Sequence, residues 1–213
     1  QAGIMAAMLV FFFGFVISCA DGDRNDEDHE TWSVTGGSKA NQKYSSLKQI
    51  DTSNVSSLDV AWIYHSEAGD SLKVGPMETN PIIIDSMLYA VSPHMKLFAI
   101  HAGTGKEIWT FDPSDSTKNP KWHRKSINMN RGVTYWQSGD DKRIIYTVGP
   151  VVYAINSLTG EIINSFGDQG GIDLRKGLDR EEKDMTISPT SPVMVYKDLF
   201  FVRGLVSETT PGH

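Results

Sequence analysis

From Trp32 onward, the chain alternates short apolar runs with groups of Gly, Asn, Asp and Pro. The runs are four to six residues long, rich in β-branched and aromatic side chains, and bounded by turn-forming residues, which is typical of β-strands. After Cys19, the sequence contains no long segment with the 3.6-residue apolar period of an amphipathic helix. The pattern predicts an all-β fold. The predicted strands are Val60–His65, Pro81–Ile84, Met87–Val91, Leu97–His101, Ile108–Phe111, Gly132–Trp136, Ile144–Val148, Val151–Ile155, Ile162–Phe166, Val193–Tyr196 and Leu199–Arg203.

An internal repeat with a period of about 55 residues organises these strands. The segment Ala99–Ile108 is echoed one period later by Ala154–Ile163, and both segments contain a Thr-Gly turn. Upstream, Met87–Tyr89 is echoed by Ile144–Tyr146 and again by Leu199–Phe201, with the second step two positions shorter than the first. Each unit reads strand, turn, strand, Thr-Gly turn, strand, because glycine allows the chain to reverse at little conformational cost.

Repeated units of this kind predict a β-propeller, because a four-stranded antiparallel sheet cannot bury both of its faces alone. Trp109 follows the first Thr-Gly turn and is expected to pack on the neighbouring sheet, whereas Asn164 stands at the equivalent place in the second unit. A plain β-sandwich with two similar hairpins is the alternative, which the third recurrence of the strand pattern disfavours. Residues 60–213 hold fewer than three such units. Closed propellers need about four to eight, so we do not expect this chain to close a ring.

The first nineteen residues have a different pattern. Ile4–Ile17 is a fourteen-residue run without charge. Such a run is short for a bilayer-spanning helix, which needs about 20 residues, and typical of a signal-peptide core. It ends in Val16-Ile17-Ser18-Cys19, which resembles a bacterial lipobox and predicts that Cys19 becomes a lipidated amino terminus. An uncleaved transmembrane anchor is the alternative. Either would export the protein and attach it to a membrane, on the periplasmic side or at the outer membrane.

Charge and cysteine content narrow the class further. The chain of 213 residues has 39% hydrophobic and 22% charged residues, which excludes a disordered chain and a multi-span membrane protein. Its net charge of −6 offers no basic surplus for nucleic acid, and residues 20–31 hold six acids against one base, as expected of a solvated linker. The single cysteine excludes an intrachain disulfide and a Cys-based zinc site. Since the chain begins with Gln1, we expect it to be part of a longer protein.

Five sequence blocks between Trp32 and the end of the chain occur in an order that is known from one protein family. They are Gly36–Trp62, Met77–Pro81, Leu97–Trp109, Arg131–Trp136 and Ser188–Pro192. With these blocks, residues 32–213 resemble the dehydrogenases that depend on pyrroloquinoline quinone (PQQ), and most closely the membrane-bound glucose dehydrogenase branch. Leu97–Trp109 resembles the tryptophan-docking repeat of that family. In this family the fold is an eight-bladed propeller with PQQ across its central axis. This chain would then supply the N-terminal part, with about three blades.

The resemblance implies that Glu78 and Arg131 contact the cofactor. PQQ is a planar o-quinone with three carboxylates, and a guanidinium can make bidentate, charge-assisted contacts with such groups. Thr190, or Ser188 beside it, is a weaker candidate for a hydroxyl contact. Glu208 is a candidate ligand of a divalent cation, Ca²⁺ or Mg²⁺, with an exposed loop acid as the alternative.

The implied activity is oxidation of a CH–OH group of a glucose-like sugar or an alcohol, with electrons passed to a membrane quinone or a cytochrome. The family's catalytic aspartate and main cation ligands lie in later blades, so no catalytic residue is expected here. The lack of adjacent cysteines favours the sugar-oxidising branch, yet Ile127 stands where that branch often has a histidine, with Asn128 or His123 as substitutes. The alternative function is a cofactor-free propeller lipoprotein that scaffolds outer-membrane assembly, which would not need Glu78 or Arg131.

Overall fold

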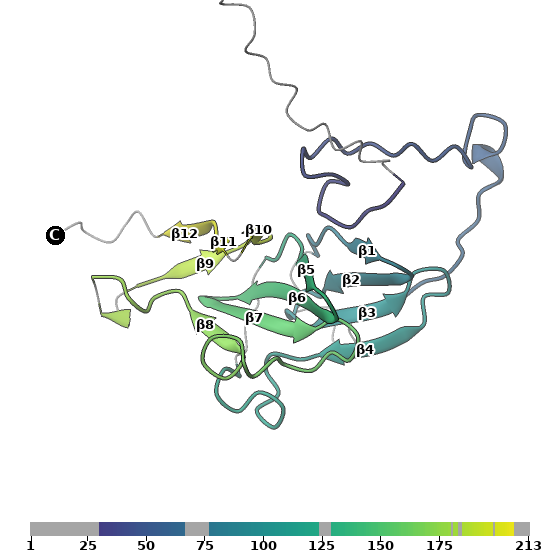
Figure 1. The fold of residues 1–213 in the computed structure, drawn as a ribbon. Helices are drawn as coiled ribbons and strands as arrows, with labels where there is room; N and C mark the ends of the chain where they lie inside the picture. Colours follow the sequence, from purple (N-terminus) through teal and green to yellow (C-terminus); the bar gives the residue numbers. More distant parts are fainter. Residues whose placement is uncertain are drawn as a thin grey trace, which may run out of the picture.

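The computed structural model describes residues 30–66, 77–123, 129–179, 181–182, 185–197 and 199–206. Across them the chain forms twelve short β-strands and one 3-10 turn, η1 (Val55–Ser57). Two four-stranded sheets lie next to each other, and the last four strands, β9–β12, lie beside the second sheet (Figure 1). The all-β prediction and the four-stranded antiparallel units are confirmed. The predicted lipobox with Cys19, nearly all of the acidic linker, and Glu208 lie outside the described residues.

The first sheet is a meander in which each strand pairs with the next, as the short turn-bounded runs predict. Its strands are β1 (Ile82–Ile84), β2 (Met87–Val91), β3 (Leu97–His101) and β4 (Glu107–Phe111). The face of this sheet toward the second sheet is buried and includes Tyr89 and Trp109. The Tyr89 hydroxyl donates to the Ser157 carbonyl at 3.1 Å, and burial raises the pKa of this phenol to about 12.

The second sheet follows the same order but has a broken fourth strand. Its strands are β5 (Thr134–Ser138), β6 (Asp141–Val148), β7 (Val151–Asn156) and β8 (Gly171–Asp173). The predicted strand Ile162–Phe166 is wrong: Ile162 makes a single bridge to Ile155, and the chain then leaves the sheet. It returns at Gly171, which pairs with Tyr153 on the other half of β7.

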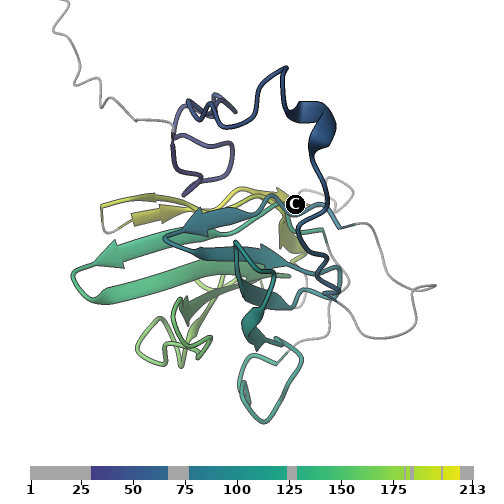
Figure 2. The ribbon, with the colours of Figure 1, turned by 90° about the vertical axis from the view of Figure 1, so that its right-hand side faces the viewer.

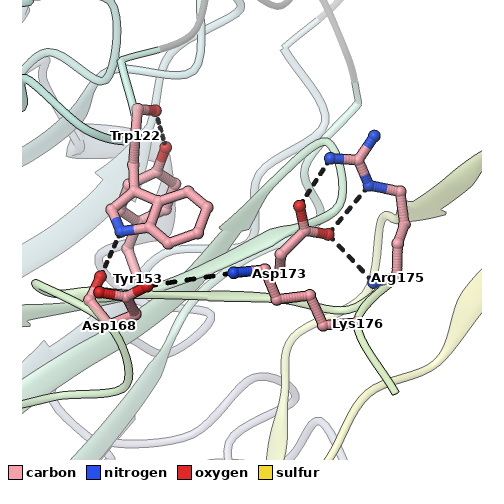
Figure 3. A network of polar contacts seen from close by, with 6 residues as sticks. All are labelled: Trp122, Tyr153, Asp168, Asp173, Arg175 and Lys176. Carbon is pink, nitrogen blue, oxygen red and sulfur yellow. Dashed lines mark hydrogen bonds and ion pairs between the residues drawn. The ribbon is translucent and has the colours of Figure 1, made fainter. Parts of the chain in front are cut away.

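Side chains from the loop between the two sheets hold the excursion between residues 163 and 171, and one of them, Trp122, is anchored by Tyr153 of β7 (Figure 3). The indole of Trp122 covers Gly171, and its N–H donates to the Asp168 carbonyl at 2.5 Å. The Tyr153 hydroxyl donates to the Trp122 carbonyl at 2.6 Å, and Lys121 forms an ion pair with Asp168. A tryptophan from the loop between the two sheets therefore packs against β8, at the place where the repeat pattern breaks.

Only the first two strands of the third unit are described. Each is divided into two short segments, the first into β9 and β10 and the second into β11 and β12. The pairs are β10 (Met194–Tyr196) with β11 (Leu199–Phe201), and β9 (Ile187–Pro189) with β12 (Gly204–Val206). The apolar side chains of this unit that face the second sheet pack with Ile145 and Val152. The described residues therefore hold two complete sheets and part of a third, as expected for a partial propeller.

The structure shifts the alignment of the repeated strands by one residue. Leu88, Ile144 and Phe200 occupy equivalent places, because each faces the preceding part of the stack. Their neighbours Tyr89 and Ile145 face the following unit. These equivalent positions are evenly spaced along the chain. The sequence alignment of Met87–Tyr89 with Ile144–Tyr146 is therefore wrong by one residue for the middle strand. The error arises because a slip of one residue turns a strand's side chains to the opposite face, while two adjacent isoleucines look alike in sequence.

Tryptophan docking joins each unit to the next. The indole N–H of Trp109 donates to the Ser157 carbonyl at 3.0 Å, and the indole ring covers Gly160 in the Thr-Gly turn of the second unit. Gly160 has φ +74°, and a Cβ added there would lie 2.7 Å from the indole. Only glycine meets both the backbone and the space requirement at this position. The predicted packing of Trp109 on the neighbouring sheet is confirmed.

Trp62 repeats this contact one unit earlier. The indole N–H of Trp62 donates to the Ala102 carbonyl at 3.0 Å, and the indole ring covers Gly105 of the first Thr-Gly turn. The predicted strand Val60–His65 is wrong, because this segment has no strand assignment and no ladder partner among the described residues. An extended segment becomes a β-strand only when a neighbour takes up its backbone hydrogen bonds. Trp62 and Tyr64 pack on the first sheet, while Val60 and Ile63 are 76% and 72% exposed.

Candidate cofactor-binding site

The segments that lead into the three units lie side by side. The backbone N–H of Asn80 donates to the Arg131 carbonyl at 3.1 Å, and the backbone N–H of Arg131 donates to the Thr190 carbonyl at 2.8 Å. Asn80 also forms a parallel bridge with Gly132. The structure therefore brings together the Glu78, Arg131 and Thr190 regions, which lie far apart in sequence, one in each unit.

Arg131 and Glu78 form a long ion pair across two units. Arg131 Nε lies 3.4 Å from Glu78 Oε2, and the two side chains are 50% and 35% exposed. An ion pair this open contributes only about 0–1 kcal/mol to stability. The contact uses one of the five N–H donors of the guanidinium, so Arg131 retains the capacity to bind an anionic planar group. The pair therefore contributes little to the stability of the fold.

Thr190 is buried, with 7% of its surface exposed. Its carbonyl accepts the Arg131 N–H, so its backbone belongs to the same cluster as the two charged residues. Ser188, the alternative hydroxyl, lies in β9, where it pairs with Leu205. Its place in a ladder gives Ser188 no comparable link to Arg131. Thr190 is the better candidate of the two for a hydroxyl contact.

The segment that contains Trp32 and Thr35 lies next to this cluster. The Ile83 N–H donates to the Trp32 carbonyl at 2.9 Å, which attaches the segment to β1. Thr35 Oγ1 is buried without a hydrogen-bond partner in the described part of the chain, and it lies beside Gly132, where a Cβ would approach it to 3.0 Å. Figure 2 shows the segment, purple to blue, passing over the edge of the sheets on the side of β1. A buried hydroxyl without a partner is costly, so this is a place where a bound group would be stabilising.

Of the remaining predicted residues, the structure describes only His123. His123 is exposed, and its Nδ1 lies 3.0 Å from the Pro120 carbonyl, in the loop that packs on β8. Asn128, Ile127 and Glu208 lie outside the described residues. The described ranges contain no group of three or more His, Cys, Asp or Glu side chains arranged to hold a metal ion. Nor do they contain a helix long and apolar enough to cross a membrane.

Three polar residues of this cluster, Asn80, Asn130 and Thr35, were not predicted as site residues from the sequence. Asn80 Nδ2 donates to the Arg131 carbonyl at 2.9 Å, and Asn130 Oδ1 accepts the Gly132 N–H at 2.8 Å. The Asn130 contact has a sequence signal, because asparagine often accepts a hydrogen bond from the backbone two residues later. The contacts of Asn80 and Thr35 join distant segments and have no local signal.

The chain matches one protein family over residues 32–212, which is most of its length. That family is described as "PQQ: Glucose/ethanol/alcohol dehydrogenase, beta-propeller domain". The chain belongs to this family. The predicted resemblance to PQQ-dependent dehydrogenases is therefore confirmed, including the presence of glucose dehydrogenases among its relatives.

Two relatives of the PQQ dehydrogenase family are named quinoprotein glucose dehydrogenase. The chain is 28% identical over 195 residues to the one from Escherichia coli (strain K12), which covers 84% of this chain and 24% of that protein. It is 28% identical over 216 residues to the one from Gluconobacter oxydans (strain 621H), which covers 91% of this chain and 26% of that protein. The chain thus spans about a quarter of the length of these curated relatives.

A solved structure gives the same family fold. The quinohemoprotein alcohol dehydrogenase ADHIIG from Pseudomonas putida HK5 superposes with a TM-score of 0.61 at 27% identity, over 84% of this chain and 23% of that chain. Alcohol and glucose dehydrogenases therefore both occur among the relatives, and the family match does not choose between them. It lends no support to the alternative of a cofactor-free scaffold.

Proposed function

We propose that this chain is the N-terminal part of the propeller of a PQQ-dependent dehydrogenase, and that Arg131 and Glu78 hold the cofactor. The observation that carries the proposal is the meeting of three lead-in segments at Arg131 in a chain that belongs to the PQQ family. The Arg131 side chain is half exposed while its backbone is fixed by hydrogen bonds, and such a guanidinium is suited to an anionic planar ligand. A surface ion pair of two charged residues would not require such a backbone cluster.

The residues around Arg131 fit the chemistry of PQQ. The guanidinium offers donors to a carboxylate or a quinone oxygen, and Glu78 orients it or accepts a hydrogen bond from a protonated cofactor group. Thr35 supplies a buried hydroxyl beside Gly132, and Thr190 is a buried residue whose carbonyl accepts the Arg131 backbone N–H. When bound, the cofactor would accept hydride from the substrate. A fixed cation beside a quinone oxygen stabilises negative charge that develops there.

The proposed substrate is a glucose-like sugar or an alcohol, and the proposed acceptor of the electrons is a membrane quinone or a cytochrome. The names of the two glucose dehydrogenases and the alcohol dehydrogenase described above support this range. A divalent cation, Ca²⁺ or Mg²⁺, is proposed as a second cofactor, with its ligands mostly in later blades and Glu208 as a candidate here. The catalytic base is likewise proposed to lie in later blades.

Reconstitution of the full-length apo-protein tests this function. PQQ and Ca²⁺ or Mg²⁺ are added, and reduction of an artificial electron acceptor is measured with glucose and with ethanol. We expect reduction that depends on both PQQ and substrate. Residues 32–213 alone are expected to bind PQQ weakly and to be inactive, because they offer only part of a central site. A full-length protein that neither binds PQQ nor reduces the acceptor would contradict the proposal.

We also propose that the protein is exported and anchored through a lipid on Cys19. The support is the fourteen-residue apolar run followed by Val16-Ile17-Ser18-Cys19. Replacing Cys19 by alanine is expected to block processing, so that the precursor migrates more slowly on a gel. Cell fractionation with metabolic lipid labelling measures the outcome. Unchanged mobility and membrane attachment in the Cys19→Ala variant would favour an uncleaved spanning helix.

A further inference from the structure

The peptide that carries Arg131 is held at three consecutive polar groups. The Arg131 N–H donates to the Thr190 carbonyl at 2.8 Å. The Arg131 carbonyl accepts from the Asn80 N–H at 3.1 Å and from Asn80 Nδ2 at 2.9 Å. The Gly132 N–H donates to Asn130 Oδ1 at 2.8 Å. The position of the Arg131 Cα is therefore set by residues of all three units.

Asn130 uses both ends of its side-chain amide in this arrangement. Its Oδ1 accepts the Gly132 N–H, and its Nδ2 donates to the Thr147 carbonyl of β6 at 3.3 Å. The orientation of the amide follows, because a backbone N–H can only donate and a carbonyl can only accept. The Thr147 hydroxyl in turn donates to the Pro189 carbonyl at 3.3 Å. Asn130 is 6% exposed, so loss of its side chain would leave buried polar groups without partners.

The backbone next to Arg131 has little room to move. Gly132 has φ +140°, and a Cβ added there would lie 2.9 Å from the Asn80 carbonyl oxygen and 3.2 Å from Pro192 Cγ. The half-exposed Arg131 side chain extends from this rigid peptide. The direction of the guanidinium therefore depends on the groups that hold the peptide, and Asn130 is the buried side chain among them.

We propose that Asn130 is a positioning residue, which sets the place of the Arg131 guanidinium toward PQQ without touching the cofactor. The inference rests on the proposed function. It differs from a general structural role in one respect. The effect of Asn130 on PQQ binding must act through Arg131, and it must disappear when the Arg131 side chain is removed.

A double-mutant cycle on the full-length apo-protein tests this coupling, with PQQ affinity measured by equilibrium dialysis. Asn130→Ala is expected to raise the PQQ dissociation constant about five- to tenfold, the loss expected for a buried hydrogen-bonded group. In an Arg131→Ala background, the same change is expected to alter the dissociation constant by less than about twofold. If Asn130→Ala does not fold by circular dichroism, Asn130→Ser replaces it, because a serine hydroxyl can still accept the Gly132 N–H but loses the contact with the Thr147 carbonyl. A smaller loss of PQQ affinity is then expected, and it must again disappear in the Arg131→Ala background.

Asn119 provides the matched control. It is 2% exposed, its Oδ1 accepts the backbone N–H of Trp122, and its Nδ2 donates to the Pro113 carbonyl, in the part of the loop that packs on β8. Asn119→Ala is expected to lower the unfolding midpoint as Asn130→Ala does, with PQQ affinity unchanged. An equal loss of affinity in the Asn119 variant, a full effect of Asn130→Ala without Arg131, or wild-type affinity in folded Asn130→Ala would each overturn the positioning role. Failure of the wild-type protein to bind PQQ would instead overturn the proposed function itself.

Discussion

Replacing Arg131 by lysine in the full-length protein is expected to weaken PQQ binding and to lower turnover even at saturating PQQ. Lysine keeps the positive charge but loses the planar fork that can contact two oxygen atoms at once. Loss of one charge-assisted contact costs about 1.5–3 kcal/mol, which corresponds to roughly a ten- to hundredfold change in affinity. Turnover falls as well, because a fixed cation stabilises charge that develops in the transition state more than it stabilises the ground state.

Titration of the apo-protein with PQQ, followed by reduction of an artificial acceptor, measures both effects of Arg131→Lys. Arg143→Lys is the matched control, because Arg143 makes a bidentate pair with Asp141 at 2.8 and 2.5 Å in the second sheet. The control is expected to leave PQQ affinity unchanged. Wild-type affinity and turnover in Arg131→Lys would show that Arg131 is a surface charge, and the cofactor assignment would fall with it.

Replacing Trp109 by alanine is expected to lower the free energy of unfolding by about 3–5 kcal/mol, the usual cost of removing a buried aromatic side chain. Trp109 is 8% exposed, packs against Tyr89 with ring centroids 5.9 Å apart, and donates to the Ser157 carbonyl. The substitution would leave a cavity between the first two sheets and remove one of the two donors to the Ser157 carbonyl, which the Tyr89 hydroxyl also contacts. Denaturant unfolding followed by circular dichroism measures the loss without relying on tryptophan fluorescence.

Substitution of two glycines distinguishes the energetic effect of the Trp109 docking contact from that of backbone strain. Gly160→Ala would place a Cβ 2.7 Å from the Trp109 indole, and Gly139→Ala would add one in open space, while both positions have positive φ, +74° and +57°. We expect Gly160→Ala to destabilise the protein clearly more than Gly139→Ala, since left-handed backbone strain alone costs about 1–2 kcal/mol in each. Equal losses in the two variants, or a loss under about 1 kcal/mol in Trp109→Ala, would contradict a stabilising role of the docking.

The sequence alone was sufficient to predict most strands of the two complete sheets. Their β-branched runs and bounding turns are local features, and the Thr-Gly turns at Gly105 and Gly160 are readable because left-handed backbone favours glycine. The resemblance also pointed to Glu78 and Arg131, which the structure places 3.4 Å apart. Their role toward the cofactor stays a prediction.

Only the tertiary structure decided which face each strand presents and where a strand ends. Leu88, Ile144 and Phe200 are equivalent because of what they pack against, and no local pattern distinguishes Ile144 from Ile145. The segment at Trp62 has strand composition without a ladder partner among the described residues, so pairing rather than propensity decided its state.

The candidate site likewise combines features that the sequence predicts with features that only the tertiary structure decides. Composition and spacing determined that this chain is an all-β repeat with charged residues at the starts of its units, because those properties depend on residues close together in sequence. The convergence of Asn80, Arg131 and Thr190 was decided by the stacking of three units, which closes long loops to form backbone hydrogen bonds between them. Asn80 and Thr35 acquire their places in that stack, because a contact between distant segments depends on how the units pack and leaves no trace in the local sequence pattern, whereas the contact of Asn130 with the Gly132 N–H is local.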